Sequence, residues 1–192
     1  MRLSLFLFLH VIVFIILLIV HPHVRAEDDG WAIEEHSKDF IYLSKNGEVI
    51  HGDKLIFAME YTNCDKLDHM FSFLTTKAPN DIHQFEQKRL PILLNGHEFT
   101  AKVILVLPVL NNRAFWVMFK LGDYETQKYA KLLSEFLEEE NEKYEIRLAD
   151  GFNFEAEKYF DITQNSWVLD NFSEKFAETY KRCKEKTILK DS

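Results

Sequence analysis

The sequence predicts a mostly β, α+β domain. We expect an antiparallel, sandwich-like set of strands, one helix at about 123–140 and a C-terminal helix at about 170–187. Short alternating or apolar runs, separated by turn residues, fill most of the chain before position 123. Two later segments instead repeat apolar residues every three or four positions, which is the spacing of one helical face. These two periodicities predict the fold class.

The N-terminal segment has the features of a secretory signal peptide. A basic residue and a long apolar run over 3–20 come first, and Pro22 then breaks the run. Val24 and Ala26 fit the small or apolar positions of a cleavage site between Ala26 and Glu27. The apolar run is also long enough to cross a bilayer, so an uncleaved, membrane-anchoring signal is the alternative interpretation.

Removal of residues 1–26 leaves residues 27–192 as a single β-rich exported domain, secreted or periplasmic. Two arginines leave with the signal, so 21 basic side chains remain against 31 acidic ones, a net charge of −10. A nucleic-acid-binding protein needs a basic surface, and an anionic membrane would repel this chain. After cleavage we therefore expect neither nucleic acid nor membrane as a partner.

The two cysteines, Cys64 and Cys183, both lie in the exported part. Two thiols in an oxidising compartment most simply form one disulfide. Because Cys183 ends an apolar helical stripe, this bond would join the last helix to the early strands. That stripe consists of Leu169, Phe172, Phe176, Tyr180 and Cys183.

The first strands are predicted as a meander. Asn46-Gly47 separates the β-prone runs 40–43 and 48–51, which is a strong signal for a tight hairpin. The run 54–61 then alternates strictly, with Leu55, Phe57, Met59 and Tyr61 on one face. A polar connection over 65–69 and a strand over 70–75 follow.

The middle of the chain is predicted as a second group of strands. Pro91 places the run 89–94 on an edge or in a bulge, because proline cannot donate to a strand ladder. Asn95-Gly96 predicts another hairpin turn. The runs 103–107 and 114–121 are continuously apolar, so we expect the fold to cover both of their faces.

The remaining elements follow from caps and turns. Asp123 is the expected N-cap of the first helix and Asn171 that of the terminal helix. Between the helices, the runs 144–148 and 152–160 flank Asp150-Gly151 and predict a third hairpin. The apolar face of the first helix consists of Tyr129, Leu132, Leu133, Phe136 and Leu137.

No motif in the sequence points to a catalytic, metal or cofactor site. Five histidines remain after cleavage without metal-ligand spacing: His36, His51, His69, His83 and His97. A small secreted hydrolase using Cys64 and His69 is one alternative function. A carrier that holds a hydrophobic ligand in an apolar core lined by Phe57, Phe115 or Phe119 is another.

The terminal segment resembles a known family. The order Phe160-Asp161, Leu169, Phe172-Ser173, Phe176-Ala177 and Cys183, after an early Trp31 and Cys64, is similar to the invasion-associated locus B type of exported alphaproteobacterial proteins. Asn171 departs from the glycine common there. The resemblance implies a β-rich, non-enzymatic, virulence-associated factor whose unknown protein partner belongs to a host cell. It carries over no catalytic residues.

Overall fold

The computed structural model describes residues 30–191 except positions 37, 51, 78 and 112. The signal peptide and the cleavage site at Ala26 and Glu27 lie outside these residues. The described chain is mostly β, with one antiparallel sheet of nine strands, a mid-chain helix and a C-terminal helix, so the predicted fold class is confirmed.

The elements run in this order: β1 (Trp31–His36), β2 (Phe40–Asn46), β3 (Lys54–Glu60), β4 (Asn63–Thr75), η1 (Ile82–Phe85), β5 (Arg89–Leu94), β6 (His97–Val109), β7 (Ala114–Glu125), α2 (Thr126–Glu139), β8 (Lys143–Leu148), α3 (Ala156–Tyr159), β9 (Gln164–Val168) and α4 (Phe172–Asp191). The strand order in the sheet is β1-β2-β3-β4-β7-β6-β5-β8-β9. The first strands form a meander, but β2 pairs directly with β3 across a longer loop, so the tight hairpin predicted at Asn46-Gly47 is wrong. The Asn95-Gly96 hairpin between β5 and β6 is present.

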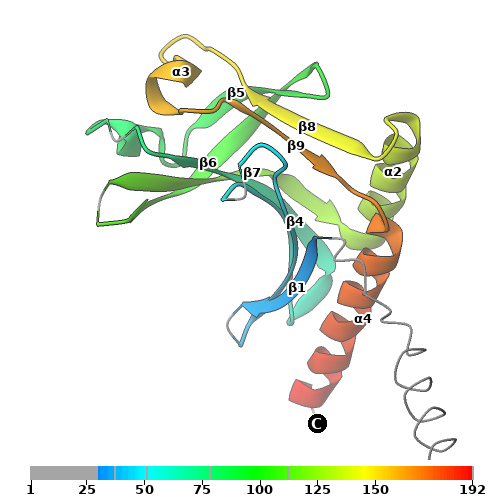
Figure 1. Ribbon diagram of the computed structural model, residues 1–192. Helices are drawn as coiled ribbons and strands as arrows, with labels where there is room; N and C mark the ends of the chain where they lie inside the picture. The colour runs from blue at the N-terminus through cyan, green and yellow to red at the C-terminus, as the bar shows by residue number, and fades with distance from the viewer. Residues whose placement is uncertain (1–29, 37, 51, 78, 112, 192) are drawn as a thin grey trace, which may run out of the picture.

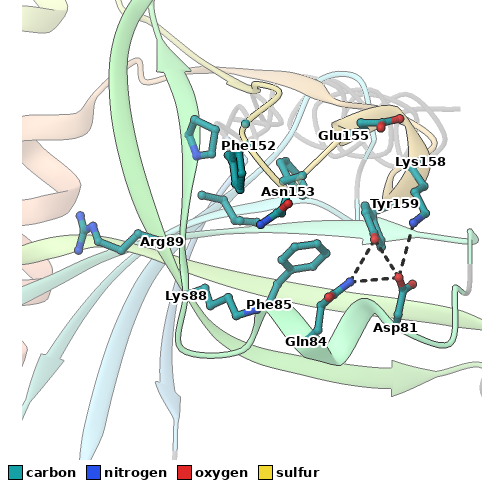
Figure 2. Close-up of a pocket in the computed structure, with 14 residues that line it drawn as sticks. Asp81, Gln84, Phe85, Lys88, Arg89, Phe152, Asn153, Glu155, Lys158 and Tyr159 are labelled. Carbon is teal, nitrogen blue, oxygen red and sulfur yellow. Dashed lines mark hydrogen bonds and ion pairs between the residues drawn. The ribbon is translucent and has the colours of Figure 1, made fainter.

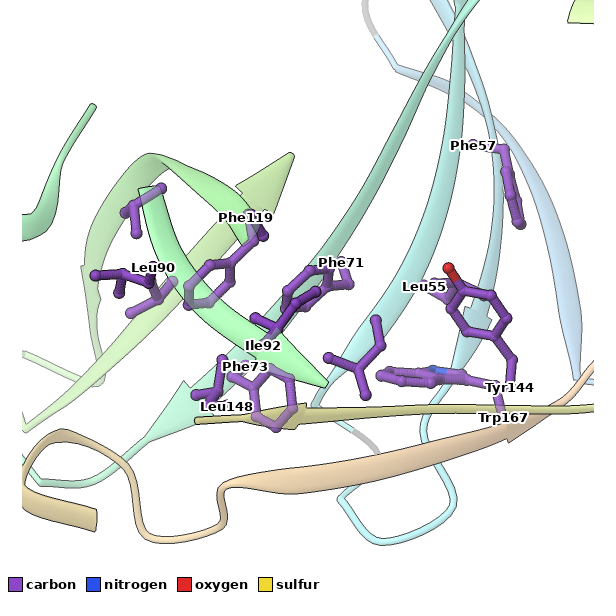
Figure 3. Packing of buried hydrophobic residues seen from close by; sticks show 14 of the residues in the cluster. Leu55, Phe57, Phe71, Phe73, Leu90, Ile92, Phe119, Tyr144, Leu148 and Trp167 are labelled. Atoms are coloured by element: carbon purple, nitrogen blue, oxygen red, sulfur yellow. The ribbon is translucent and has the colours of Figure 1, made fainter. Parts of the chain in front are cut away.

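The single sheet curls, so that its last strands lie across from its first ones (Figure 1). Trp167 of β9 and Leu148 of β8 face Leu55 and Phe73 of β3 and β4 in the core (Figure 3). Helices α2 and α4 complete the enclosure, since their buried residues join the same core cluster. The core therefore lies inside the curl of one sheet.

A buried polar contact joins the two ends of the curl. Asp53, in the loop after β2, accepts hydrogen bonds from the Asn165 side chain of β9 (2.8 Å) and from the Leu74 backbone N–H (2.7 Å). Asp53 and Asn165 are both fully buried. A Cβ at Gly47 would collide with the Asn165 side chain, so glycine permits this close approach.

Helix α4 packs on the concave face and is fixed there covalently. The Phe172 ring lies 5.2 Å and the Phe176 ring 6.1 Å from the ring of Phe57. The predicted disulfide between Cys64 and Cys183 is present, with Cα atoms 5.9 Å apart. Such a bond indicates an oxidising, extracytoplasmic compartment.

Three local predictions were wrong, each because a distant partner outweighed a local pattern. Residues 65–69 are not a connection but the first half of β4, where Leu67 and His69 point inward. Residues 152–160 form a turn and α3 rather than a strand, and β8 pairs with β5 and β9. Of the predicted run 48–51, residues 48–50 are a loop whose Glu48 N–H donates to the Ser166 carbonyl of β9 (2.9 Å), and position 51 lies outside the described residues.

The predicted cap at Asp123 was also wrong. Strand β7 continues through this position to Glu125, because its ladder with β4 extends to the pair Lys66 and Glu125. Glu125 is the N-cap residue of α2 and its side chain makes no capping hydrogen bond. Asp123 instead forms an ion pair with Lys120.

Strand β5 lies inside the sheet, yet its proline is tolerated. The ladder with β8 starts at Ile92, so Pro91 lies at the end of that ladder. Its carbonyl still accepts a hydrogen bond from the Ala149 N–H (3.1 Å). Pro91 has no N–H to donate, but because it lies where the ladder between β5 and β8 ends, no hydrogen bond of that ladder is lost.

The apolar strands β6 and β7 are covered on one face only, contrary to the prediction. Phe115, Val117 and Phe119 of β7 point into the core, whereas Trp116 and Met118 lie on the opposite, convex face. Among the described residues, α2 and α4 both pack on the concave side. On the convex face, Leu105 and Leu107 therefore remain at the surface, whereas Ile56, Ala58 and Met70 are buried under neighbouring side chains.

Loss of the disulfide should strongly destabilise the fold. The bond joins residues 119 positions apart, and closing a loop of this length stabilises the folded state by roughly 4–5 kcal/mol in the chain-entropy model. We expect Cys64→Ser/Cys183→Ser to lower the free energy of unfolding in urea by about this amount. Reductant should lower it similarly in the wild type and leave the double variant unchanged. An equal free energy of unfolding with and without the bond would contradict the prediction.

Asp53 should make stability depend on pH. Burial raises the pKa of Asp53 to about 6, above the ordinary value of roughly 3.9 for the unfolded chain. The folded state thus holds the proton more tightly, and this contribution to stability is full at low pH and is lost as the pH rises from about 4 to 6. Relative to Asp53→Asn, the wild type should lose about 2 kcal/mol between pH 4.5 and 7 in urea titrations. A constant difference between the two proteins would contradict this assignment.

Candidate functional site

The structure gives Cys64 and His69 structural positions. The Cys64 sulfur is bonded to Cys183, and a sulfur in a disulfide has no thiolate with which to attack a substrate. His69 is fully buried on β4, where its ring stacks on Phe57 with centroids 4.5 Å apart. Its Nδ1 lies 2.5 Å from the Tyr129 hydroxyl of α2. While the disulfide is intact, Cys64 therefore cannot act as the nucleophile that the hydrolase hypothesis requires.

The three phenylalanines of the carrier hypothesis are packed against the chain's own rings. Phe119 stacks on Phe71 with centroids 4.7 Å apart, and Phe57 contacts Phe172. Phe115 meets the His83 ring edge-on at 5.5 Å. The positions at which that hypothesis placed an apolar ligand are occupied by protein side chains.

A polar pocket of about 630 Å³ lies between η1, the start of β5 and residues 151–159 (Figure 2). Asp81 accepts hydrogen bonds from Gln84 Nε2 and the Tyr159 hydroxyl, both at 3.0 Å, and pairs with Lys158 at 3.5 Å. The Tyr159 hydrogen bond holds the pKa of the Asp81 carboxyl below its usual range. The carboxylate therefore stays ionised and joins η1 to α3, while the ring of Phe152 is fully exposed at the rim.

A second, apolar cavity of about 430 Å³ lies between α2 and the β5–β6 hairpin. It exists because two neighbouring strands separate: β6 pairs with β7 only from Lys102 onward, so its residues 97–101 pair with β5 alone. Helix α2 lies beside this opening. We call this cavity the α2 groove; it is lined by Arg89, Leu94, His97, Phe99, Thr100, Leu121, Tyr124, Tyr129, Leu132, Leu133, Phe136 and Tyr144.

The convex face of the sheet is a third candidate. Ile56, Ala58 and Met70 form a small cluster there, against which Tyr42, Ile104 and Met118 pack. Leu105 lies beside Met118 and Leu107 beside Trp116 in the ladder between β6 and β7. Leu105 is 38% and Leu107 42% exposed. We call this set the convex apolar face.

Comparison with known proteins adds no residue assignment. No protein-family model, curated protein or solved structure matches this chain. Within the described ranges, no three His, Cys, Asp or Glu side chains are grouped as metal ligands. The same part of the chain contains no helix that is both long and apolar enough to span a bilayer.

Sequence reasoning missed both the α2 groove and the exposure of the convex apolar face. One local signal was present for the groove: Phe99 stands alone as an apolar residue in a polar stretch, and it is 51% exposed. Leu132 was assigned to the buried stripe of α2 but is 63% exposed. Phe99 lies on the β6 wall of the groove and Leu132 on its α2 wall.

His69 should remain neutral at pH values where exposed histidines are protonated. Burial lowers the pKa of His69 to about 3, because the charged imidazolium loses its hydration. In an NMR titration of the folded protein, the His69 ring signals should stay unchanged from pH 7 to 4.5. Protonation of His69 above pH 5 would contradict the predicted burial effect.

Proposed function

We propose that the chain is an exported, non-enzymatic binding protein that engages a protein partner outside the cytoplasm. The disulfide supports the compartment, because such bonds persist where conditions are oxidising. The resemblance of the terminal segment to invasion-associated locus B proteins supports a host-cell protein as the partner and a virulence-associated role.

The convex apolar face is the observation that carries this proposal. Soluble proteins rarely leave a contiguous apolar surface on a sheet unless another molecule covers it. Here β3, β4, β7 and β6 contribute apolar side chains to one face; Leu105 and Leu107 of β6 are its exposed part, and Ile56, Ala58 and Met70 lie buried beside them. Burying Leu105 and Leu107 against a partner would remove apolar area from water, which is the main favourable term in association.

The border of this face is polar, as in protein interfaces that combine an apolar centre with a charged rim. Lys120 follows Met118 on the convex side of β7 and pairs with Asp68 of β4 at 2.9 Å. This ion pair closes the apolar area toward the α2 end of the strands. The arrangement favours a partner with an apolar patch of matching extent.

Substitution on the convex apolar face should abolish partner capture. We expect immobilised residues 27–192 with Leu105→Ser/Leu107→Ser to lose a host-cell protein that the wild type retains from cell extracts. The free energy of unfolding should change little, because both side chains are already partly exposed.

A matched control lies on another surface. Ile188 of α4 is 68% exposed, so Ile188→Ser removes an equally apolar side chain away from the convex face. Capture should survive this change. Equal capture by the wild type and the double variant, with both proteins folded by circular dichroism, would exclude the convex face as the interface.

A further inference from the structure

We propose that the α2 groove binds one amphipathic anion, an aliphatic chain that ends in a carboxylate. This site lies on the concave side of the sheet, away from the convex apolar face, and does not depend on the proposed partner. The proposal rests on the apolar walls of the groove, the charge at its mouth and an unpartnered hydroxyl in its lining.

The walls provide an apolar surface that the fold itself does not use. Phe99 of β6 and Leu132 of α2 both line the groove and are more than half exposed. Leu94 and Phe136 extend the same lining and are only partly buried. A volume of about 430 Å³ lies in the range of roughly 300–1,000 Å³ that is typical of small-molecule sites.

The charge at the mouth selects an anion. Arg89 lines the groove, and none of the lining residues is acidic, although acidic residues outnumber basic ones in the chain. Arg89 donates from Nε to Thr100 Oγ1 and from Nη2 to the Thr100 carbonyl, both at 2.9 Å. These bonds hold the guanidinium beside the point where β6 and β7 separate.

Arg89 retains donors for a ligand. A guanidinium has five N–H groups in a fork that matches a carboxylate, and Arg89 has no carboxylate partner among the described residues. Its positive charge also acts on the lining of the groove, because it opposes the rise that burial causes in the pKa of Tyr124. An anionic head group would be stabilised at this position.

The aromatic lining contains an unused donor. The Tyr144 side chain lines the groove and is 1% exposed, and its hydroxyl has no hydrogen-bond partner in the described part of the chain. Neighbouring Tyr129 is already engaged with His69. A buried hydroxyl without a partner is costly, so a polar atom bound in the groove would stabilise this arrangement.

Calorimetric titration of disulfide-bonded residues 27–192 with decanoate tests the proposal. We expect one site per chain, with the affinity for decanoate about tenfold or more above that for decyltrimethylammonium, which has the same chain length and the opposite charge. Absence of decanoate binding would overturn the proposal. Equal affinity for the two probes would overturn the anionic selectivity.

Paired variants locate the site. Arg89→Gln should weaken decanoate binding about tenfold, since a charge-assisted hydrogen bond is lost. Lys88→Gln, at the neighbouring exposed position, should leave binding unchanged. Phe99→Ala should weaken binding several-fold, whereas Phe152→Ala, which alters the exposed ring at the polar pocket, should not. Equal binding by Arg89→Gln and Lys88→Gln, or by the two phenylalanine variants, would place the ligand elsewhere.

Discussion

The fold depends on the buried contact between Asp53 and Asn165. Two helices cover only part of the concave side of the sheet, so the rest of the core is enclosed by the sheet itself, which curls and is held together at this contact. Asn165 fixes β9 to the loop after β2, and the adjacent bond from Glu48 to Ser166 extends the contact. Trp167, the next inward residue of β9, is thereby placed against the early strands.

The elements that the sequence predicts correctly are those with local causes. Asn95-Gly96 forms its turn with positive φ at both residues, as that dipeptide favours. The stripes of α2 and α4 are helical at nearly the expected positions. The predictions for residues 65–69, 152–160 and 48–50 are wrong because the structure of these segments is set by strands elsewhere in the chain. The partners lie outside each local segment: Lys66 pairs with Glu125, β8 pairs with β9 beyond the turn and α3, and Glu48 bonds to Ser166. Such pairings leave no local periodicity.

The candidate sites were less predictable than the fold. Apolar runs in β6 and β7 indicate strands, but they do not tell whether one face or both will be covered. The α2 groove arises where those two strands separate beyond Lys102, which is a property of the sheet as a whole. Arg89 and Tyr144 become candidate binding residues only because this opening places both of them in the lining of one cavity. By contrast, the pairing of Cys64 with Cys183 could be predicted, because the exported part of the chain contains two cysteines and an oxidising compartment favours a disulfide between them.

The disulfide also imposes an order on maturation. Cys64 lies in the early meander, but its partner belongs to α4, the last element of the described chain. For a chain that crosses a membrane from its N-terminal end, the bond can form only after translocation has proceeded past Cys183. Until then the meander lacks Phe172 and Phe176, which cover Phe57, and its apolar side remains open. Oxidation is therefore coupled to completion of the core, and with two cysteines in the sequence no mispaired intramolecular bond can compete.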